Sequence, residues 1–387
     1  MQRGMTGHYE VTTIGGEEVR AFLPYPLPPN PPLEMTPDRQ QCLERATLAL
    51  GRLDSITLLL PNPDLFLYSY VRREAVLSSQ IEGTQSSLAD LLLFELEETP
   101  GVPLDDVGEV SNYVAALHHG LKRLKEGFPL SNRLLREMQV ELLSRGIGSS
   151  KAPGEFRRTQ NWIGGTRPGN AHFVPPPPGA VEDGMAALER FLHEKQSPYS
   201  ALIKAALTHV QFETIHPFLD GNGRLGRLLI ALVLHAEGVL SQPLLYLSLF
   251  FKQHRSEYYR LLDLVRSEGD WEAWVDFFLE GVDRTASRAV QTAKRLVTIF
   301  REDEQTLEEL GRLAANTLRV HRTFCEPPLL TLPQICSRAG ITFPTAAKGV
   351  ENLVRLGVVR ELTGQRRHRI FAYDRHLAIL NEETEPL

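Results

Sequence analysis

Residues 216–227 read HPFLDGNGRLGR, and this stretch separates two segments that predict helices. The preceding segment, YSALIKAALTHVQFETI (residues 199–215), has an amphipathic pattern, whereas the following one, RLGRLLIALVLHAEG (224–238), is apolar on almost every side. A helix without a polar face must be buried, so the second helix belongs deep inside a helical bundle. His216 ends the first helix, because the residue before a proline disfavours helical geometry.

The middle of this stretch has the features of an anion site. Gly221-Asn222-Gly223 is a flexible turn directly before a helix N-terminus, where backbone N–H groups and the helix dipole bind phosphate. Arg224 and Arg227 share one face of the first turn, although that end of a helix is already positive. The two cations therefore indicate that an anion normally occupies the site. Asp220 adds an oxygen ligand suited to Mg²⁺ held together with phosphate oxygens.

Other interpretations of the histidines are open at this point. His209 and His216 are seven residues apart and could bind a metal from one helix face, but no third ligand stands at a useful spacing. A lone histidine near a helix end is also commonly structural. The whole constellation is more specific than its parts, and it predicts a magnesium–polyphosphate site with a histidine beside it.

The composition is that of an ordinary globular protein. The chain has 387 residues, of which 42% are hydrophobic and 23% charged, and this length predicts two or three domains. It has no apolar run long enough to span a membrane and no apolar signal-peptide core at its start, so we expect a cytoplasmic protein. Its three cysteines are far apart, which argues against disulfides and zinc. The net charge of −6 restricts any nucleic-acid binding to a local surface.

Helical patterns dominate the rest of the chain. The first 35 residues end in PYPLPPNPPLEM and predict an extended strap. The clearest strand candidate is residues 161–178, NWIGGTRPGNAHFVPPPP, whose two apolar runs around a turn predict a β-hairpin. Helices are predicted from Thr36 onward and then at 64–80, 86–98, 106–127, 131–145, 180–195, 199–214, 223–236, 255–266, 271–281 and 283–317.

The C-terminal segment has a different pattern. Two short helices at 332–339 and 342–356 precede VVRELTGQRRHRIFAY, which alternates around a turn, and this order predicts a winged helix-turn-helix. Residues 333–376 hold eight Lys/Arg and three acidic residues, a local charge of +5. Such a module binds DNA, docks proteins or is a plain solvated domain. Arg366, Arg367 and Arg369 fall in its expected wing.

The residues quoted so far resemble a known family. HPFLDGNGRLGR matches the motif HPFx(D/E)GNGRxxR of the Fic domain family. GEFRRTQNWIGG with AHFVPPPP resembles the family's flap, and residues 254–282 resemble the helices that follow the motif. SSQIEG at 78–83 fits the family's inhibitory pattern (S/T)xxxE(G/N), and winged-helix modules occur in bacterial members.

The resemblance implies that this protein transfers AMP from ATP to Ser, Thr or Tyr hydroxyls of target proteins and of itself. His216 would be the general base and Asp220 would hold Mg²⁺. A target segment would add as a strand to the flap. The nucleotide would be bound by Gly221, Asn222, Gly223, Arg224, Leu225, Gly226, Arg227 and Tyr259, while Arg266 stands where some relatives carry an adenine-binding Asn.

The inhibitory pattern implies an intramolecular switch. Ser78 and Glu82 are four residues apart on one helix face, and Gly83 can end that helix. Without the resemblance, Glu82 is an ordinary surface residue. With it, Glu82 would pair with Arg227, the arginine expected to bind the γ-phosphate, and would turn the α-phosphate away from attack. Glu82 could also orient water and support removal of AMP.

Together these inferences predict a mainly α fold: a Fic-type helical bundle with a β-hairpin flap, plus a winged helix-turn-helix. The expected partners are ATP, a hydroxyl-bearing protein substrate, DNA at the winged helix and a second copy of the chain. Two alternatives stay open: transfer of another phosphate-containing group, and a transcription regulator whose Fic domain only senses nucleotide. The predicted divisions are 1–110 with the inhibitory motif, 111–282 as catalytic core, 283–326 as linker helix and 327–387 as winged helix.

Overall fold

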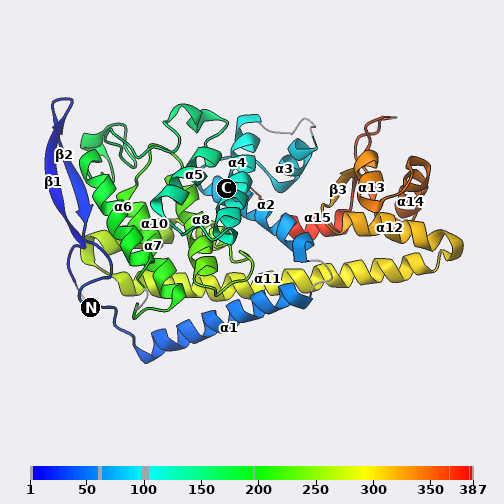
Figure 1. Cartoon of the computed structure of the whole chain (residues 1–387), viewed down its shortest axis with the longest axis horizontal. Coiled ribbons are helices and arrows are strands. Elements are labelled where there is room, and N and C mark those ends of the chain that lie inside the picture. Colours follow the sequence, from blue (N-terminus) through cyan, green and yellow to red (C-terminus); the bar gives the residue numbers. More distant parts are fainter. Residues whose placement is uncertain are drawn as a thin grey trace. The chain divides into compact units, whose positions relative to one another are not determined.

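The structure, a computed structural model, describes residues 3–59, 63–96, 104–194, 197–365, 367–382 and 384–385 (Figure 1). The fold is mainly α, as predicted, and the described residues form two small antiparallel sheets besides the helices. Among these residues, no helix combines the length and apolar character that crossing a bilayer requires.

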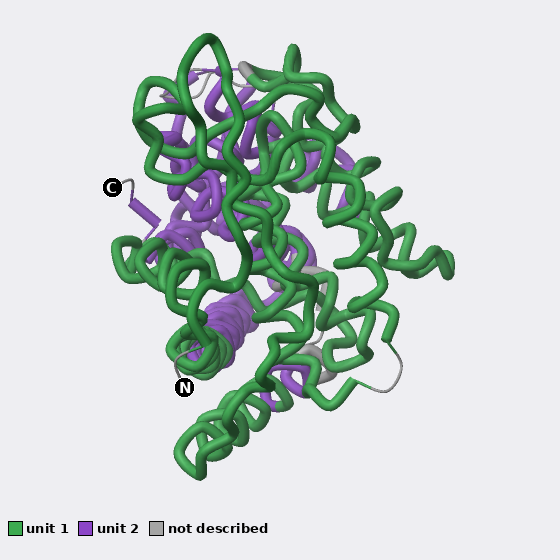
Figure 2. Tube along the Cα trace, turned by 90° about the vertical axis from the view of Figure 1, so that its left-hand side faces the viewer, with its two compact units in different colours: residues 1–51, 111–286 green, residues 52–110, 287–387 purple. Residues whose placement is uncertain are grey.

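The chain divides into two compact units, residues 1–51 with 111–286 and residues 52–110 with 287–387 (Figure 2). The division falls within α1 (Pro37–Leu59), α4 (Leu104–Lys125) and α11 (Trp271–Glu308). The first unit also contains β1 (Gly7–Ile14), β2 (Glu17–Pro24), α5 (Asn132–Leu142), η1 (Ile147–Ser150), η2 (Pro168–Asn170), α6 (Pro178–Leu192), α7 (Ala201–Ile215), α8 (Asn222–Ala236), α9 (Ser248–Gln253) and α10 (Arg255–Glu268).

Helices α7 and α8 pack against each other at the centre of the first unit. The predicted burial of α8 is confirmed, since nearly all of its side chains from Asn222 to Leu234 are buried. The amphipathic interpretation of α7 was wrong, because every residue from Leu202 to Ile215 is buried. Its polar groups have internal partners: Lys204 Nζ lies 2.6 Å from Glu237 Oε1, and the Ala206 carbonyl accepts a 2.9 Å bond from Trp274 Nε1.

The N-terminal segment contains a β-hairpin where the sequence predicted only an extended strap. Strands β1 and β2 pair antiparallel from Gly7↔Pro24 to Ile14↔Glu17, joined by Gly15 and Gly16, both with positive φ. The predicted hairpin at 161–178 is reduced to a single bridge between Ile163 and Phe173, with η2 between them. Four prolines follow Val174 and offer no N–H to extend this pairing.

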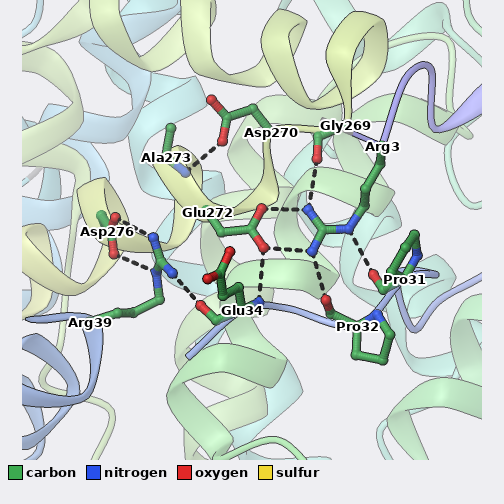
Figure 3. Close-up of polar contacts among 10 residues, drawn as sticks. All are labelled: Arg3, Pro31, Pro32, Glu34, Arg39, Gly269, Asp270, Glu272, Ala273 and Asp276. Carbon is green, nitrogen blue, oxygen red and sulfur yellow. Dashed lines mark hydrogen bonds and ion pairs between the residues drawn. The ribbon is translucent and has the colours of Figure 1, made fainter. Parts of the chain in front are cut away.

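Two ion pairs, of which Arg3–Glu272 is buried, fasten this N-terminal segment to the corner between α10 and α11 (Figure 3). The Arg3 guanidinium pairs with the Glu272 carboxylate and donates to the carbonyls of Gly269 at 3.1 Å and of Pro31 and Pro32 at 2.7 Å. Arg39 pairs with Asp276 at 2.7 Å. The strap from Tyr25 to Thr36 is thereby tied to the start of α11.

The predicted break between helices 271–281 and 283–317 is absent, because α11 continues from Trp271 to Glu308. Gly281 lies inside the helix and makes room for a ring: an added Cβ would lie 2.7 Å from Phe250 Cδ1. The short helix α9, which carries Phe250, was not predicted.

The second unit contains α2 (Pro63–Ile81) and α3 (Leu88–Glu95), and its C-terminal part forms a three-stranded sheet ordered β3-β5-β4. The order of helix, turn, helix and paired strands is the predicted one, while its assignment as a winged helix stays a prediction, and Arg366 lies outside the described residues. The elements of this part are η3 (Gly311–Leu313), α12 (Ala314–Phe324), β3 (Leu329–Thr331), α13 (Leu332–Ala339), α14 (Phe343–Arg355), β4 (Arg360–Glu361), β5 (Ile370–Ala372) and α15 (Asp374–Asn381).

Candidate active site

His216 ends α7 in a left-handed conformation, with φ 49° and ψ 61°. Its N–H still donates to the Phe212 carbonyl at 2.9 Å, so the imidazole leaves the helix at a fixed point. A left-handed backbone is uncommon for a residue other than glycine and persists only where the surroundings enforce it. The predicted base thus stands at a strained helix end.

The loop between His216 and α8 is closed by the side chain of Asn222. Its Oδ1 accepts from the Phe218 N–H at 2.9 Å, and its Nδ2 donates to the Phe218 carbonyl at 2.8 Å. Gly221 caps α8 with φ 80°, and an added Cβ there would lie 3.1 Å from Leu142. Because a glycine has no side chain to accept a hydrogen bond, the first N–H groups of α8 can donate to other acceptors. This is the backbone arrangement that binds phosphate.

The structure brings Asp220 and the two arginines of the motif to the start of α8. Arg224 and Arg227 are each 5% exposed, and Arg224 Nη2 lies 3.3 Å from Asp220 Oδ1. The Asp220 side chain is about one-third exposed, and the backbone carbonyl of Asp220 accepts from Gln139 Nε2 at 3.2 Å. Two buried cations beside one accessible carboxylate suit a polyphosphate with a divalent cation.

The fit to Mg²⁺ follows from the donor set. No group of three or more His, Cys, Asp or Glu suited to a metal occurs among the residues that the structure describes. Mg²⁺ in nucleotide sites is held by one or two carboxylates together with phosphate oxygens. A single protein ligand, the Asp220 carboxylate, is therefore enough. The open alternative of a His209–His216 metal pair loses its support, because His209 lies in the core. Its Nδ1 bonds the Gly226 carbonyl and its Nε2 the Tyr258 hydroxyl, each at 2.9 Å.

The remaining motif residues divide between core and surface. Leu225 is fully buried, and Gly226 allows a close crossing of α7, since an added Cβ would lie 2.3 Å from Glu213 Oε1. Of the adjacent tyrosines on α10, Tyr258 is in the core, and Tyr259 is 40% exposed and accessible to a ligand. The nucleotide-binding roles of these residues stay predictions.

The arginine at position 266 has a structural environment that the sequence did not reveal. Its Nη1 donates to Asp263 Oδ1 at 2.8 Å, its Nε to Thr214 Oγ1 at 3.3 Å, and its guanidinium lies 3.9 Å from the centre of the Phe173 ring. Burial lowers the pKa of Arg266 despite the neighbouring carboxylate. Arg266 thus joins α10 to α7 and to the segment containing Phe173.

The predicted inhibitory residues lie at the end of α2, in the second unit. Ser78 is fully buried, whereas Glu82 is exposed and lies one residue beyond the helix, its N–H donating to the Ser79 carbonyl at 3.0 Å. Gly83, two residues after the end of α2, has φ 107°, a conformation that does not continue the helix. The pairing of Glu82 with Arg227 stays a prediction.

Comparisons with known proteins match the same segments. The model described as Fic/DOC family N-terminal matches residues 40–122, and the Fic/DOC family model matches residues 129–234. A Drosophila grimshawi protein named protein adenylyltransferase Fic is 35% identical over 64% of this chain and 48% of its own length. Its Aedes aegypti namesake is 39% identical over 53% of this chain and 39% of its own length. The chain thus spans half or less of these curated relatives.

Solved structures share the fold. A Fic family protein from Desulfovibrio desulfuricans aligns with a TM-score of 0.59 at 20% identity, covering 88% of this chain and 97% of that one. Fic-1 from C. elegans aligns with a TM-score of 0.52 at 22% identity, covering 66% of this chain and 73% of that one. The two family models match neighbouring segments, and the second contains the whole of His216–Arg227, so residues 40–122 are similar to the Fic/DOC family N-terminal region and residues 129–234 to the Fic/DOC family domain.

Proposed function

We propose that this protein transfers AMP from ATP to a hydroxyl side chain of a protein. The observation that carries the proposal is the pair of buried arginines at the glycine-capped start of α8, one loop away from His216. Binding an anion alone would not require a base. The name protein adenylyltransferase, which the relatives bear, supports the same activity.

In the proposed reaction, His216 takes the proton of the acceptor hydroxyl as its oxygen attacks the α-phosphorus of ATP. The bond from the α-phosphorus to the bridging oxygen breaks, and pyrophosphate leaves. Arg224, Arg227 and the first N–H groups of α8 would stabilise the charge that gathers on it. Asp220 would hold Mg²⁺, which neutralises phosphate charge when bound, and Tyr259 would border the adenosine.

The segment from Asn161 to Val174, which we call the flap, would dock the acceptor. The stretches before and after η2 are the first and second arms of the flap. They pair through Ile163, whose N–H donates to the Phe173 carbonyl at 2.8 Å. Asn161 Nδ2 donates to the Phe218 carbonyl at 3.1 Å, which ties the flap to the loop after His216. An extended target segment can add to such an arm through backbone bonds and present a Ser, Thr or Tyr hydroxyl.

We further propose that Glu82 inhibits the transfer by occupying the place of the γ-phosphate at Arg227, and that Glu82 also supports removal of AMP from modified targets. Support comes from the SSQIEG pattern at 78–83 and from the exposed carboxylate just past the end of α2. A carboxylate is the natural substitute for a phosphate beside a buried arginine.

The test incubates wild type, Glu82→Gly, and Glu82→Gly with His216→Ala with Mg²⁺ and ATP labelled at the α- or the γ-phosphate. We expect Glu82→Gly to label itself from α-labelled ATP only, with a mass gain of one AMP moiety, and at least about 100-fold faster than wild type. Loss of the general base should reduce labelling by about 10²–10⁴ while ATP binding by calorimetry persists.

Gln85→Gly is the matched control, because it places a glycine in the same exposed loop and keeps the carboxylate. Equal labelling of wild type and Glu82→Gly would refute the inhibitory role. Labelling from the γ-phosphate would instead show that the protein transfers phosphate. No labelling from either phosphate would leave only the alternative that the protein senses nucleotide.

A further inference from the structure

Arg157 is a buried arginine on the approach to the flap, and its bonds converge on the loop that carries His216. Its side chain lies in the first unit, and the residue is 3% exposed. Its backbone N–H donates to the Pro217 carbonyl and its Nε to the His216 carbonyl, both at 2.9 Å. Its Nη2 donates to the carbonyls of Ile215 and Pro176.

The partners of this guanidinium are carbonyl oxygens rather than a carboxylate. No ion pair of Arg157 occurs within the described ranges. Burial lowers the pKa of Arg157 to about 10, so the side chain still carries its charge at neutral pH. Two of the acceptors, Ile215 and His216, are at the C-terminal end of α7, where a cation meets the negative end of the helix dipole.

The same guanidinium therefore bonds both the segment that follows the flap and the end of α7 that carries His216. The Pro176 carbonyl lies two residues beyond the C-terminal end of the flap, and the His216 carbonyl belongs to the backbone of the proposed base. Neighbouring amides reinforce the junction: Gln160 Nε2 donates to the Pro175 carbonyl at 2.9 Å, and Asn161 bonds the Phe218 carbonyl. Of these groups, only Arg157 bonds directly to His216.

We propose that Arg157 is a positioning residue that fixes the flap relative to His216 and so sets where an acceptor hydroxyl meets the base. The inference rests on the proposed function, because it assigns the geometry of that reaction. A planar guanidinium donates in several fixed directions at once, which a lysine ammonium cannot reproduce. A shift of about 1 Å between base and acceptor can cost about 100-fold in rate.

The experiment uses full-length protein carrying Glu82→Gly, with Arg157→Gln, Arg157→Lys or Arg158→Gln added. Arg158 is the matched control: its side chain is 87% exposed and its guanidinium lies 3.7 Å from Glu155. For Arg157→Gln we expect kcat of self-AMPylation to fall by about 100-fold with KM for ATP unchanged. Arg157→Lys should restore part of kcat, and Arg158→Gln should match its parent.

Hydrogen exchange on the same proteins gives a readout independent of activity. Arg157→Gln should speed exchange in both the flap and residues 215–218, while the interior of α7 keeps its protection. The proposal is overturned if kcat is unchanged, if KM for ATP rises as much as kcat falls, or if α7 loses protection as a whole. If the parent itself transfers no AMP, the proposed function has failed. In that case hydrogen exchange alone tests the positioning role. Loss of protection in both the flap and residues 215–218 supports it, and unchanged exchange overturns it.

Discussion

At the scale of the single residue, Gly226 shows how a motif position can serve packing. It follows Leu225 in the stretch GNGRLGR, yet its open side faces Glu213 of α7, and its carbonyl accepts from buried His209. A side chain at this position would clash with the Glu213 carboxylate and crowd the Phe212 ring, between two helices that are buried along nearly their whole lengths.

We expect Gly226→Ala to lower the free energy of unfolding by about 1–3 kcal/mol, because an added methyl group overpacks a closed contact. Gly179→Ala is the control: this helical glycine of α6 has no atom within 4 Å of its Cβ position. It should be neutral or slightly stabilising, since alanine favours helix by about 1 kcal/mol. Urea unfolding of the two variants measures the difference. Equal stabilities would mean that the α7–α8 crossing relaxes freely.

The local chemistry of the site was predictable because it depends on short spacings. The three-residue interval places Arg224 and Arg227 on one turn, and Asp220 is within reach of Arg224 because four residues separate them. The roles of Arg157 and Arg266 could not be predicted. Apart from Asp263, their partners are carbonyls, a hydroxyl and a ring contributed by segments 19 to 93 residues away in sequence, and no local pattern encodes such contacts.

At the scale of the element, the N-terminal hairpin and the flap form one surface of the first unit. The Phe22 N–H of β2 donates to the Val174 carbonyl at 2.9 Å, and Val19 and Ala21 pack with Val174 in a small apolar cluster. Arg167 at the tip of the flap pairs with Glu17. The second flap arm thus has the first arm on one side and β2 on the other.

We expect Ala21→Asp to free the flap from the hairpin, since Ala21 is fully buried in that cluster and a carboxylate there has no partner among its apolar neighbours. Hydrogen exchange at 171–174 should rise and AMP transfer should fall. Val11→Asp places the same charge on an exposed position of the same hairpin, 56% accessible, and should change neither. If the two variants behave alike, the hairpin does not support the flap.

The elements that were mispredicted share a physical cause. The β1–β2 hairpin had a usable signal, alternating residues around Gly15-Gly16, which the prolines that follow obscured. In the flap, the side chain of Asn170 accepts from the N–H groups of Thr166 and Arg167, so a compact turn replaces strand pairing there. Gly281 lies inside α11, where it allows close packing against Phe250. Glycine and proline indicate unusual backbone geometry or close packing. Tertiary contacts decide whether the result is a hairpin, a compact turn or a tightly packed helix.

At the scale of the whole molecule, each unit buries a histidine that is neutral when folded. Burial lowers the pKa of His209 in the first unit to about 3 and that of His376 in the second to about 4. Both rings have hydrogen-bond partners, the Gly226 and Phe324 carbonyls at 2.9 and 3.1 Å. An unfolded histidine has a pKa of about 6.5, so below that pH the unfolded chain binds protons that the folded chain does not.

The stability that these histidines contribute is therefore fully present above about pH 6.5 and is lost as pH falls toward the folded pKa values. Between pH 7 and 5 we expect His209 and His376 each to cost its unit about 2 kcal/mol, measured by hydrogen exchange in α7 for the first unit and in α15 for the second. His209→Gln should be less stable at pH 7 but should show a smaller loss on acidification in α7, with α15 unaffected. His8→Gln, on the exposed strand β1, is the control and should keep the full pH dependence. A loss in α7 of the same size with and without His209 would show that other groups govern the acid sensitivity of that unit.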